Sequence, residues 1–79
     1  MSYTIGLLTH DGELGDYIYT FYPSFESAKL EGLEALKEHQ IARDNGVNDS
    51  MFGWAFGFEI FDEMDKSAYK FNGGINAHV

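Results

Sequence analysis

An alternating run of aromatic residues is the feature that most constrains how this chain folds. In residues 51–61, MFGWAFGFEIF, a ring stands at every second position from 52 to 58, and Gly53, Ala55 and Gly57 fill the positions between the rings. Side chains of a strand point alternately to its two faces, so the pattern predicts a third strand, to about position 60, with one aromatic and one almost bare face. Glycine weakens a strand, so the bare face indicates that another backbone comes close, in this chain or in a partner. The predicted core face of this strand comprises Phe52, Trp54, Phe56, Phe58 and Ile60.

Two further strands are predicted near the N-terminus. Residues 3–9 and 16–22 alternate and are rich in Tyr, Thr and Ile, which favour strands. Between them, Asp11-Gly12 and Gly15 tolerate positive φ, so the pair is predicted to form a hairpin with a loop of several residues. Tyr and Thr occupy both faces, which leaves open which face of the sheet is buried.

One long amphipathic helix is predicted to follow. Pro23 ends the second strand, Ser24 is a suitable N-cap, and Asn45-Gly46 is the expected stop after a helix that runs to about Arg43. His39 falls near the apolar stripe of this helix, which favours a partly buried core residue over a ligand or base. The stripe expected to lie on the sheet comprises Phe25, Ala28, Gly32, Leu33, Ala35 and Leu36.

The C-terminal segment is compatible with two structures. Residues 62–72 fit a short helix capped by Asp62 and stopped by Asn72-Gly73, and we favour that helix over a strand. Residues 75–79 would suit a short edge strand or a frayed end. The sequence therefore predicts a single compact α+β domain over residues 1–79, in the order β-β-α-β-α. Its small antiparallel sheet would have about three strands, with the long helix on one face and a second short helix.

The charge of the chain limits its partners. Thirteen Asp and Glu oppose five Lys and Arg, and the formal net charge of −8 disfavours direct binding to nucleic acid or to anionic membranes. There is no secretory signal and no run of 18 apolar residues, so we expect neither export nor a membrane span. The absence of cysteine favours a cytoplasmic location.

The sequence contains no motif that predicts catalysis. It has no cysteine, no serine in a strand-to-helix elbow and no glycine spacing of a phosphate loop, so we expect neither an enzyme nor a bound cofactor. In principle His10, Asp11, Glu13 and Asp16 could hold a divalent cation. Their spacing differs from that of calcium loops and a terminal bidentate Glu is missing, so a solvated turn is favoured over a metal site.

An acidic ridge on the predicted helix is the main candidate for function. Glu31, Glu34 and Glu38 follow i, i+3, i+7 spacing, so their side chains line one face. One interpretation is solubility alone. The other is that the ridge imitates a row of phosphates and occupies a basic groove of a nucleic-acid-binding protein, with Leu30 and Ile41 as apolar contacts. Six acids of the loops would extend the partner-binding surface: Asp11, Glu13, Asp16, Asp62, Glu63 and Asp65.

In size, charge and the ridge of Glu31, Glu34 and Glu38, the chain resembles small acidic inhibitors that bacteriophages encode, including anti-CRISPR proteins and other DNA mimics. The resemblance implies a non-enzymatic inhibitor of a host defence complex, acting in the host cytoplasm. The strand and capped helix of YIYTFYPSFESAKLEGLEALKEH, residues 17–39, also look like the layout of small antitoxin-type domains.

We therefore expect a protein-binding inhibitor whose partner has a basic surface and handles nucleic acid. The alternative hypothesis is a structural or assembly role through self-association, for example as a homodimer. In that case the bare face of Gly53, Ala55 and Gly57 would let a second copy approach closely.

Overall fold

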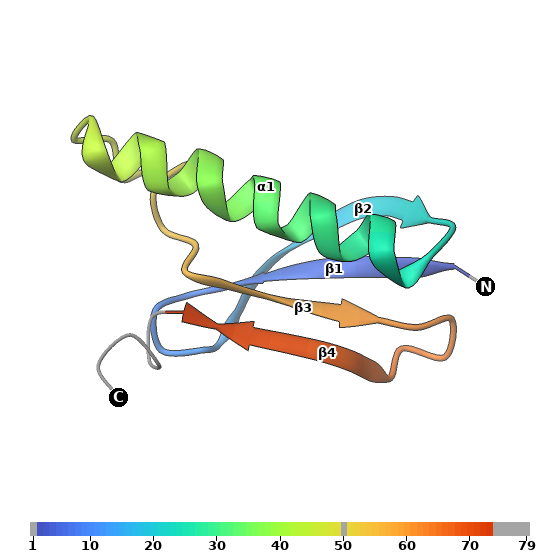
Figure 1. The fold of residues 1–79 in the computed structure, drawn as a ribbon. Helices are drawn as coiled ribbons and strands as arrows, with labels where there is room; N and C mark the ends of the chain where they lie inside the picture. The colour runs from blue at the N-terminus through green and yellow to red at the C-terminus, as the bar shows by residue number, and fades with distance from the viewer. Residues whose placement is uncertain (1, 50, 74–79) are drawn as a thin grey trace.

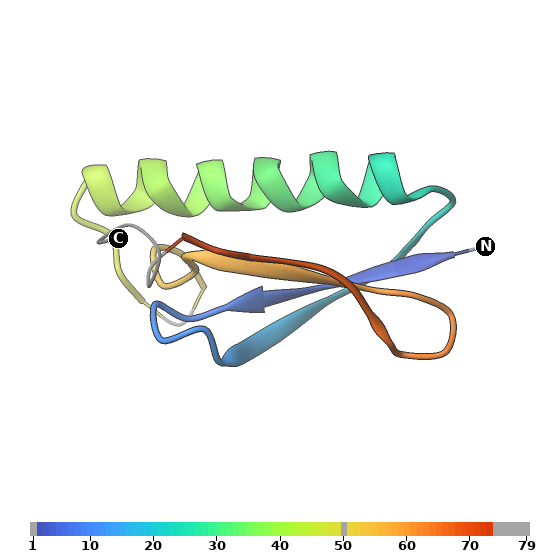
Figure 2. The same ribbon diagram turned by 60° about the horizontal axis from the view of Figure 1, so that its bottom comes forward.

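The fold consists of one helix lying on one face of an antiparallel sheet. The computed structural model describes residues 2–49 and 51–73. Within them the strands β1 (Tyr3–Leu8), β2 (Leu14–Tyr22), β3 (Gly57–Phe61) and β4 (Ser67–Asn72) form a sheet in the order β2-β1-β3-β4. The helix α1 (Phe25–Asp44) covers one face of this sheet (Figures 1 and 2). No other described element covers the opposite face, which is called the open face below.

The α+β class is as predicted, but the number of elements is not. The described residues form four strands and one helix, so the prediction of about three strands and two helices is wrong. The predicted second helix is replaced by a turn and β4. The Asp62 carboxylate accepts hydrogen bonds from the Met64 and Lys66 amides at 2.9 and 3.0 Å, and Asp65 has a φ of 59°. These hydrogen bonds hold residues 62–66 in a turn, and the positive φ of Asp65 is incompatible with an α-helix. The expected edge strand over 75–79 lies outside the described residues.

Local signals predicted the hairpin and the helix ends correctly. The β1–β2 hairpin forms across the expected loop, and Ser24 is the N-cap of α1. Its hydroxyl accepts a hydrogen bond from the Ser27 amide at 3.1 Å, while the Ser27 hydroxyl accepts one from the Ser24 amide. Past the C-terminus of the helix, Gly46 has a φ of 79°, which is why the chain can turn there at low cost.

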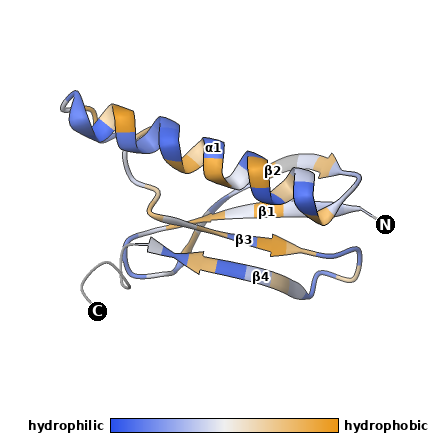
Figure 3. Cartoon of the chain, viewed as in Figure 1, coloured by the Kyte–Doolittle hydropathy of each residue, from blue (hydrophilic) through white to orange (hydrophobic). Residues whose placement is uncertain are grey.

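The core lies between α1 and the two central strands. Phe58 and Ile60 of β3 and Ile5 of β1 are fully buried. A Cβ placed on Gly32 would lie 2.5 Å from Cδ2 of Phe58, so this glycine lets the helix rest directly on the ring. The helix alternates between apolar and polar residues along its length (Figure 3). The apolar stripe predicted for the helix is largely correct, but Leu33 is 45% exposed and does not belong to it.

The third strand is shorter than predicted. It begins at Gly57, so residues 51–56 do not form the first half of a strand. The Asp49 carboxylate accepts hydrogen bonds from the Met51 and Phe52 amides at 2.8 and 2.9 Å, and Gly53 has a φ of 95°. This turn breaks the alternation, so Phe52 is exposed instead of lying in a continuous wall of rings.

Candidate functional site

The acidic ridge of Glu31, Glu34 and Glu38 lies on the surface of α1. All three residues are exposed, and none forms a hydrogen bond or ion pair with the part of the chain that the structure describes. Leu30 and Ile41, the apolar contacts predicted beside the ridge, are 63% and 51% exposed. The ridge is therefore available to a partner together with apolar side chains on the same helix.

The ridge also acts on its own protein through its charge. The pKa of Tyr22 is raised, first because the phenol is partly buried and second because the negative charge of Glu31 disfavours the phenolate. Near the other end of the ridge, the pKa of His39 is lowered by burial first and by Arg43 second, and the charge of Glu38 opposes that shift. The charges of Glu31 and Glu38 thus each favour the protonated form of a neighbouring side chain, Tyr22 and His39.

The other six predicted acids lie in two separate places. Asp11, Glu13 and Asp16 lie at or beside the β1–β2 turn, at the end of the sheet where Leu8 pairs with Gly57. The turn that follows β3 holds Asp62, Glu63 and Asp65, at the opposite end of the sheet (Figure 1). The structure therefore brings the residues of the ridge together but does not join them to both loops in one surface.

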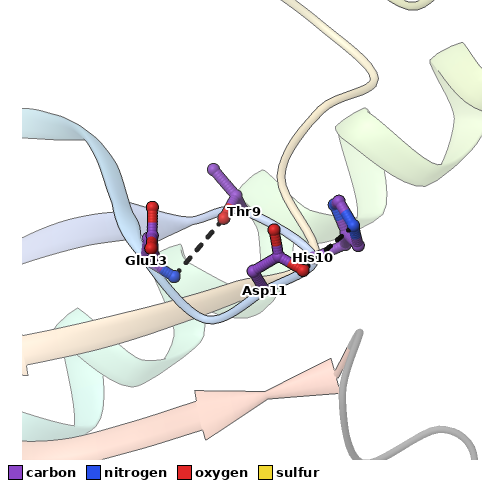
Figure 4. Close-up of polar contacts among 4 residues, drawn as sticks. All are labelled: Thr9, His10, Asp11 and Glu13. Carbon is purple, nitrogen blue, oxygen red and sulfur yellow. Dashed lines mark hydrogen bonds and ion pairs between the residues drawn. The ribbon is translucent and has the colours of Figure 1, made fainter.

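The β1–β2 turn is held by short-range contacts. His10 Nε2 lies 3.1 Å from Asp11 Oδ1, and the Glu13 amide donates a hydrogen bond to Thr9 Oγ1 at 3.3 Å (Figure 4). The side chains of His10 and Asp11 are both exposed. Across the described ranges, no group of three or more His, Asp or Glu side chains is placed to hold a metal ion.

A second arrangement, which sequence reasoning missed, joins α1 to the irregular segment before β3. His39 Nδ1 accepts hydrogen bonds from the amides of Gly53 and Ala55 at 3.0 and 3.3 Å. Arg43 Nη1 donates to the carbonyls of the same two residues at 2.9 and 2.8 Å. One turn of helix thus satisfies two amides and two carbonyls that have no strand partner. We call this pair of side chains the His39–Arg43 clamp.

The clamp explains the burial and ionisation of His39. The residue is 4% exposed, as its position near the apolar stripe predicted, and Trp54 meets its ring edge-on at 5.3 Å. Burial is the main cause of its lowered pKa, and the positive charge of Arg43 adds to it. Because Nδ1 accepts both hydrogen bonds, the neutral ring carries its proton on Nε2. We therefore assign His39 a structural role.

The bare face predicted for the third strand packs against other parts of the same chain. Gly53, Ala55 and Gly57 are all buried. A Cβ on Gly53 would clash with the carbonyl oxygen of Val47, and one on Gly57 would clash with that of Phe71. The close backbone is therefore in this chain, and the self-association hypothesis lacks the exposed face on which it depended.

Comparisons with family models, curated proteins and solved structures found no match. Among the described residues, no helix is both long and apolar enough to cross a membrane.

Proposed function

We propose that this protein is a non-enzymatic inhibitor that binds a basic, nucleic-acid-binding surface of a partner protein through the acidic ridge on α1. The observation that carries the proposal is that Glu31, Glu34 and Glu38 are exposed together and unpaired within the described part of the chain. We place the protein in the cytoplasm, where a host defence complex is the class of partner that fits such an inhibitor.

Repulsion within the ridge lowers the stability of the free protein and favours binding to a partner of opposite charge. Like charges at i, i+3 and i+4 destabilise a helix by a few tenths of a kcal/mol per pair, and a row of Lys and Arg on a partner would turn this repulsion into attraction. The net charge of −8 steers the encounter with a basic surface. Leu30 and Ile41 supply apolar area next to the carboxylates, which lengthens the life of the complex.

Reversing the three charges of the ridge should remove partner capture. We expect the variant Glu31→Lys, Glu34→Lys, Glu38→Lys to retain at least tenfold less partner than the unchanged protein in affinity capture from the native host lysate. Capture by the unchanged protein should weaken steeply with added salt, because salt screens the attraction. Added duplex DNA should release the captured partner, since both would occupy the same site.

The matched control changes the same amount of charge elsewhere. The variant Asp11→Lys, Glu13→Lys, Asp16→Lys alters the net charge by the same amount but places the change at the β1–β2 turn. It should retain most of the captured partner. Equal losses in the two triple variants would show that net charge alone matters and would remove the ridge from the proposal.

A further inference from the structure

The open face of the sheet carries a groove that lies away from the acidic ridge. It has a volume of about 450 Å³, within the range of small-ligand sites. Thr4 and Phe61 in its lining are next in sequence to Ile5 and Ile60, which are buried in the core under α1, so their side chains point to the open face. Figure 2 shows that α1 covers only the other face of the sheet. The residues that line it are Thr4, Tyr17, Ile18, Phe21, Phe61 and Asp65.

Strand pairing explains why rings gather in this groove. Phe61 of β3 pairs with Thr4 of β1, and Tyr17 of β2 pairs with Gly6 on the other side of β1. Because Gly6 has no side chain, the rings of Tyr17 and Phe61 approach across it to a centroid distance of 5.9 Å. Phe21, from an irregular part of the β1–β2 pairing, adds a third ring that is 74% exposed.

A single carboxylate is present among these rings. The turn after β3 brings Asp65 to the groove, with its backbone fixed at a φ of 59°. Within the part of the chain that the structure describes, the Asp65 carboxylate has no hydrogen-bond or ion-pair partner. Aromatic faces attract cations, and a carboxylate among them attracts the same charge. The groove therefore presents apolar walls together with negative electrostatic potential.

We infer that this groove binds an arginine side chain from a basic segment of the partner protein. A guanidinium group fits better than an ammonium group because it is planar, stacks on rings and can bind a carboxylate in a bidentate manner. The same protein already contains the stacking half of this arrangement, since the Arg43 Cζ lies 3.8 Å from the ring centroid of Phe56. The inference rests on the proposed function for the basic character of the partner, but it concerns a different face of the molecule.

A pair of peptides tests the inference on the intact protein. The probe is the blocked peptide acetyl-Gly-Arg-Gly-amide, and its control replaces arginine by citrulline, which has nearly the same shape but no charge. In nuclear magnetic resonance titrations, the arginine peptide should shift the signals of Tyr17, Phe61 and Asp65 in a saturable manner. It should bind at least fivefold more tightly than the citrulline peptide.

Substitutions separate this site from the ridge. Asp65→Asn should reduce arginine-peptide binding to the level of the citrulline peptide, whereas Asp11→Asn should leave it unchanged. The triple Lys variant of the ridge should still bind the peptide, so failure of the ridge and failure of the groove are distinguishable. Equal binding of the two peptides, or shifts confined to other residues, would overturn the inference. Signals of the groove that move on dilution without peptide would also overturn it, because they would identify a second copy as the occupant.

Discussion

Replacing Gly53 by alanine should destabilise the protein far more than the same change at Gly46. Both residues have positive φ, 95° and 79°, where alanine is strained by about 1–2 kcal/mol. A Cβ on Gly46 would meet no atom within 4 Å, whereas one on Gly53 would clash with the Val47 carbonyl oxygen and lie 2.9 Å from Asn48 Cα. We expect a loss of about 1 kcal/mol at Gly46 and of about 3 kcal/mol or more at Gly53.

Gly57 separates steric crowding from backbone strain, because other atoms lie close to it but its φ is not positive. Its Cβ would clash with the Phe71 carbonyl oxygen of the neighbouring strand. Gly57→Ala should therefore show the cost of crowding alone, about 1–3 kcal/mol. Urea unfolding followed by circular dichroism measures all three variants on one scale. Equal and small losses at Gly46 and Gly53 would show that the backbone of residues 47–48 does not lie against Gly53.

The parts of the fold that the sequence predicted are those fixed by local contacts. Ser24 and Ser27 bond to each other's backbone, and Gly46 turns the chain directly after the helix, so these signals lie within a few residues of their effects. The exposure of Glu31, Glu34 and Glu38 follows from helical periodicity in the same way. In contrast, the apolar residues of 62–72 have the spacing of a helix. The last six of these residues form β4 because they pair with β3, Tyr69 with Ile60 and Phe71 with Phe58.

The errors around residues 51–56 have one local and one long-range origin. Alternation of rings predicts a strand, but Asp49 bonds the next amides into a turn, and the His39–Arg43 clamp satisfies the backbone that a neighbouring strand would otherwise pair. The clamp residues precede their partners by 10 to 16 positions. The periodicity of the sequence predicts which face of an element is buried, but it does not predict hydrogen bonds between residues so far apart. The groove was also beyond local reasoning, because it joins residues of β1, β2, β3 and the turn after β3.

The stability of the protein should fall as the pH drops from 7.5 to 5, because of His39. The pKa of this residue in the folded protein is below its ordinary value of 6.5, mainly through burial and further through Arg43. The unfolded chain therefore takes up a proton near pH 6.5 while the folded protein does not. The contribution of His39 to the free energy of unfolding is thus constant well above pH 6.5. It decreases as the pH falls from about 6.5 towards the pKa of His39 in the folded protein.

The same protonation would break the clamp, since Nδ1 accepts hydrogen bonds from the Gly53 and Ala55 amides. Leaving a buried amide unsatisfied costs about 1–3 kcal/mol, so His39→Ala should lose about 2–4 kcal/mol at pH 7.5. The variant His39→Gln keeps a hydrogen-bond acceptor but cannot titrate, and its free energy of unfolding should vary much less between pH 7.5 and 5. His10→Gln is the matched control, because the His10 side chain is exposed and lies outside the clamp, and it should lose much less of the pH dependence than His39→Gln. If His39→Gln retained that dependence, other titratable groups would be its source, and the clamp would not be the pH-sensitive element of this fold.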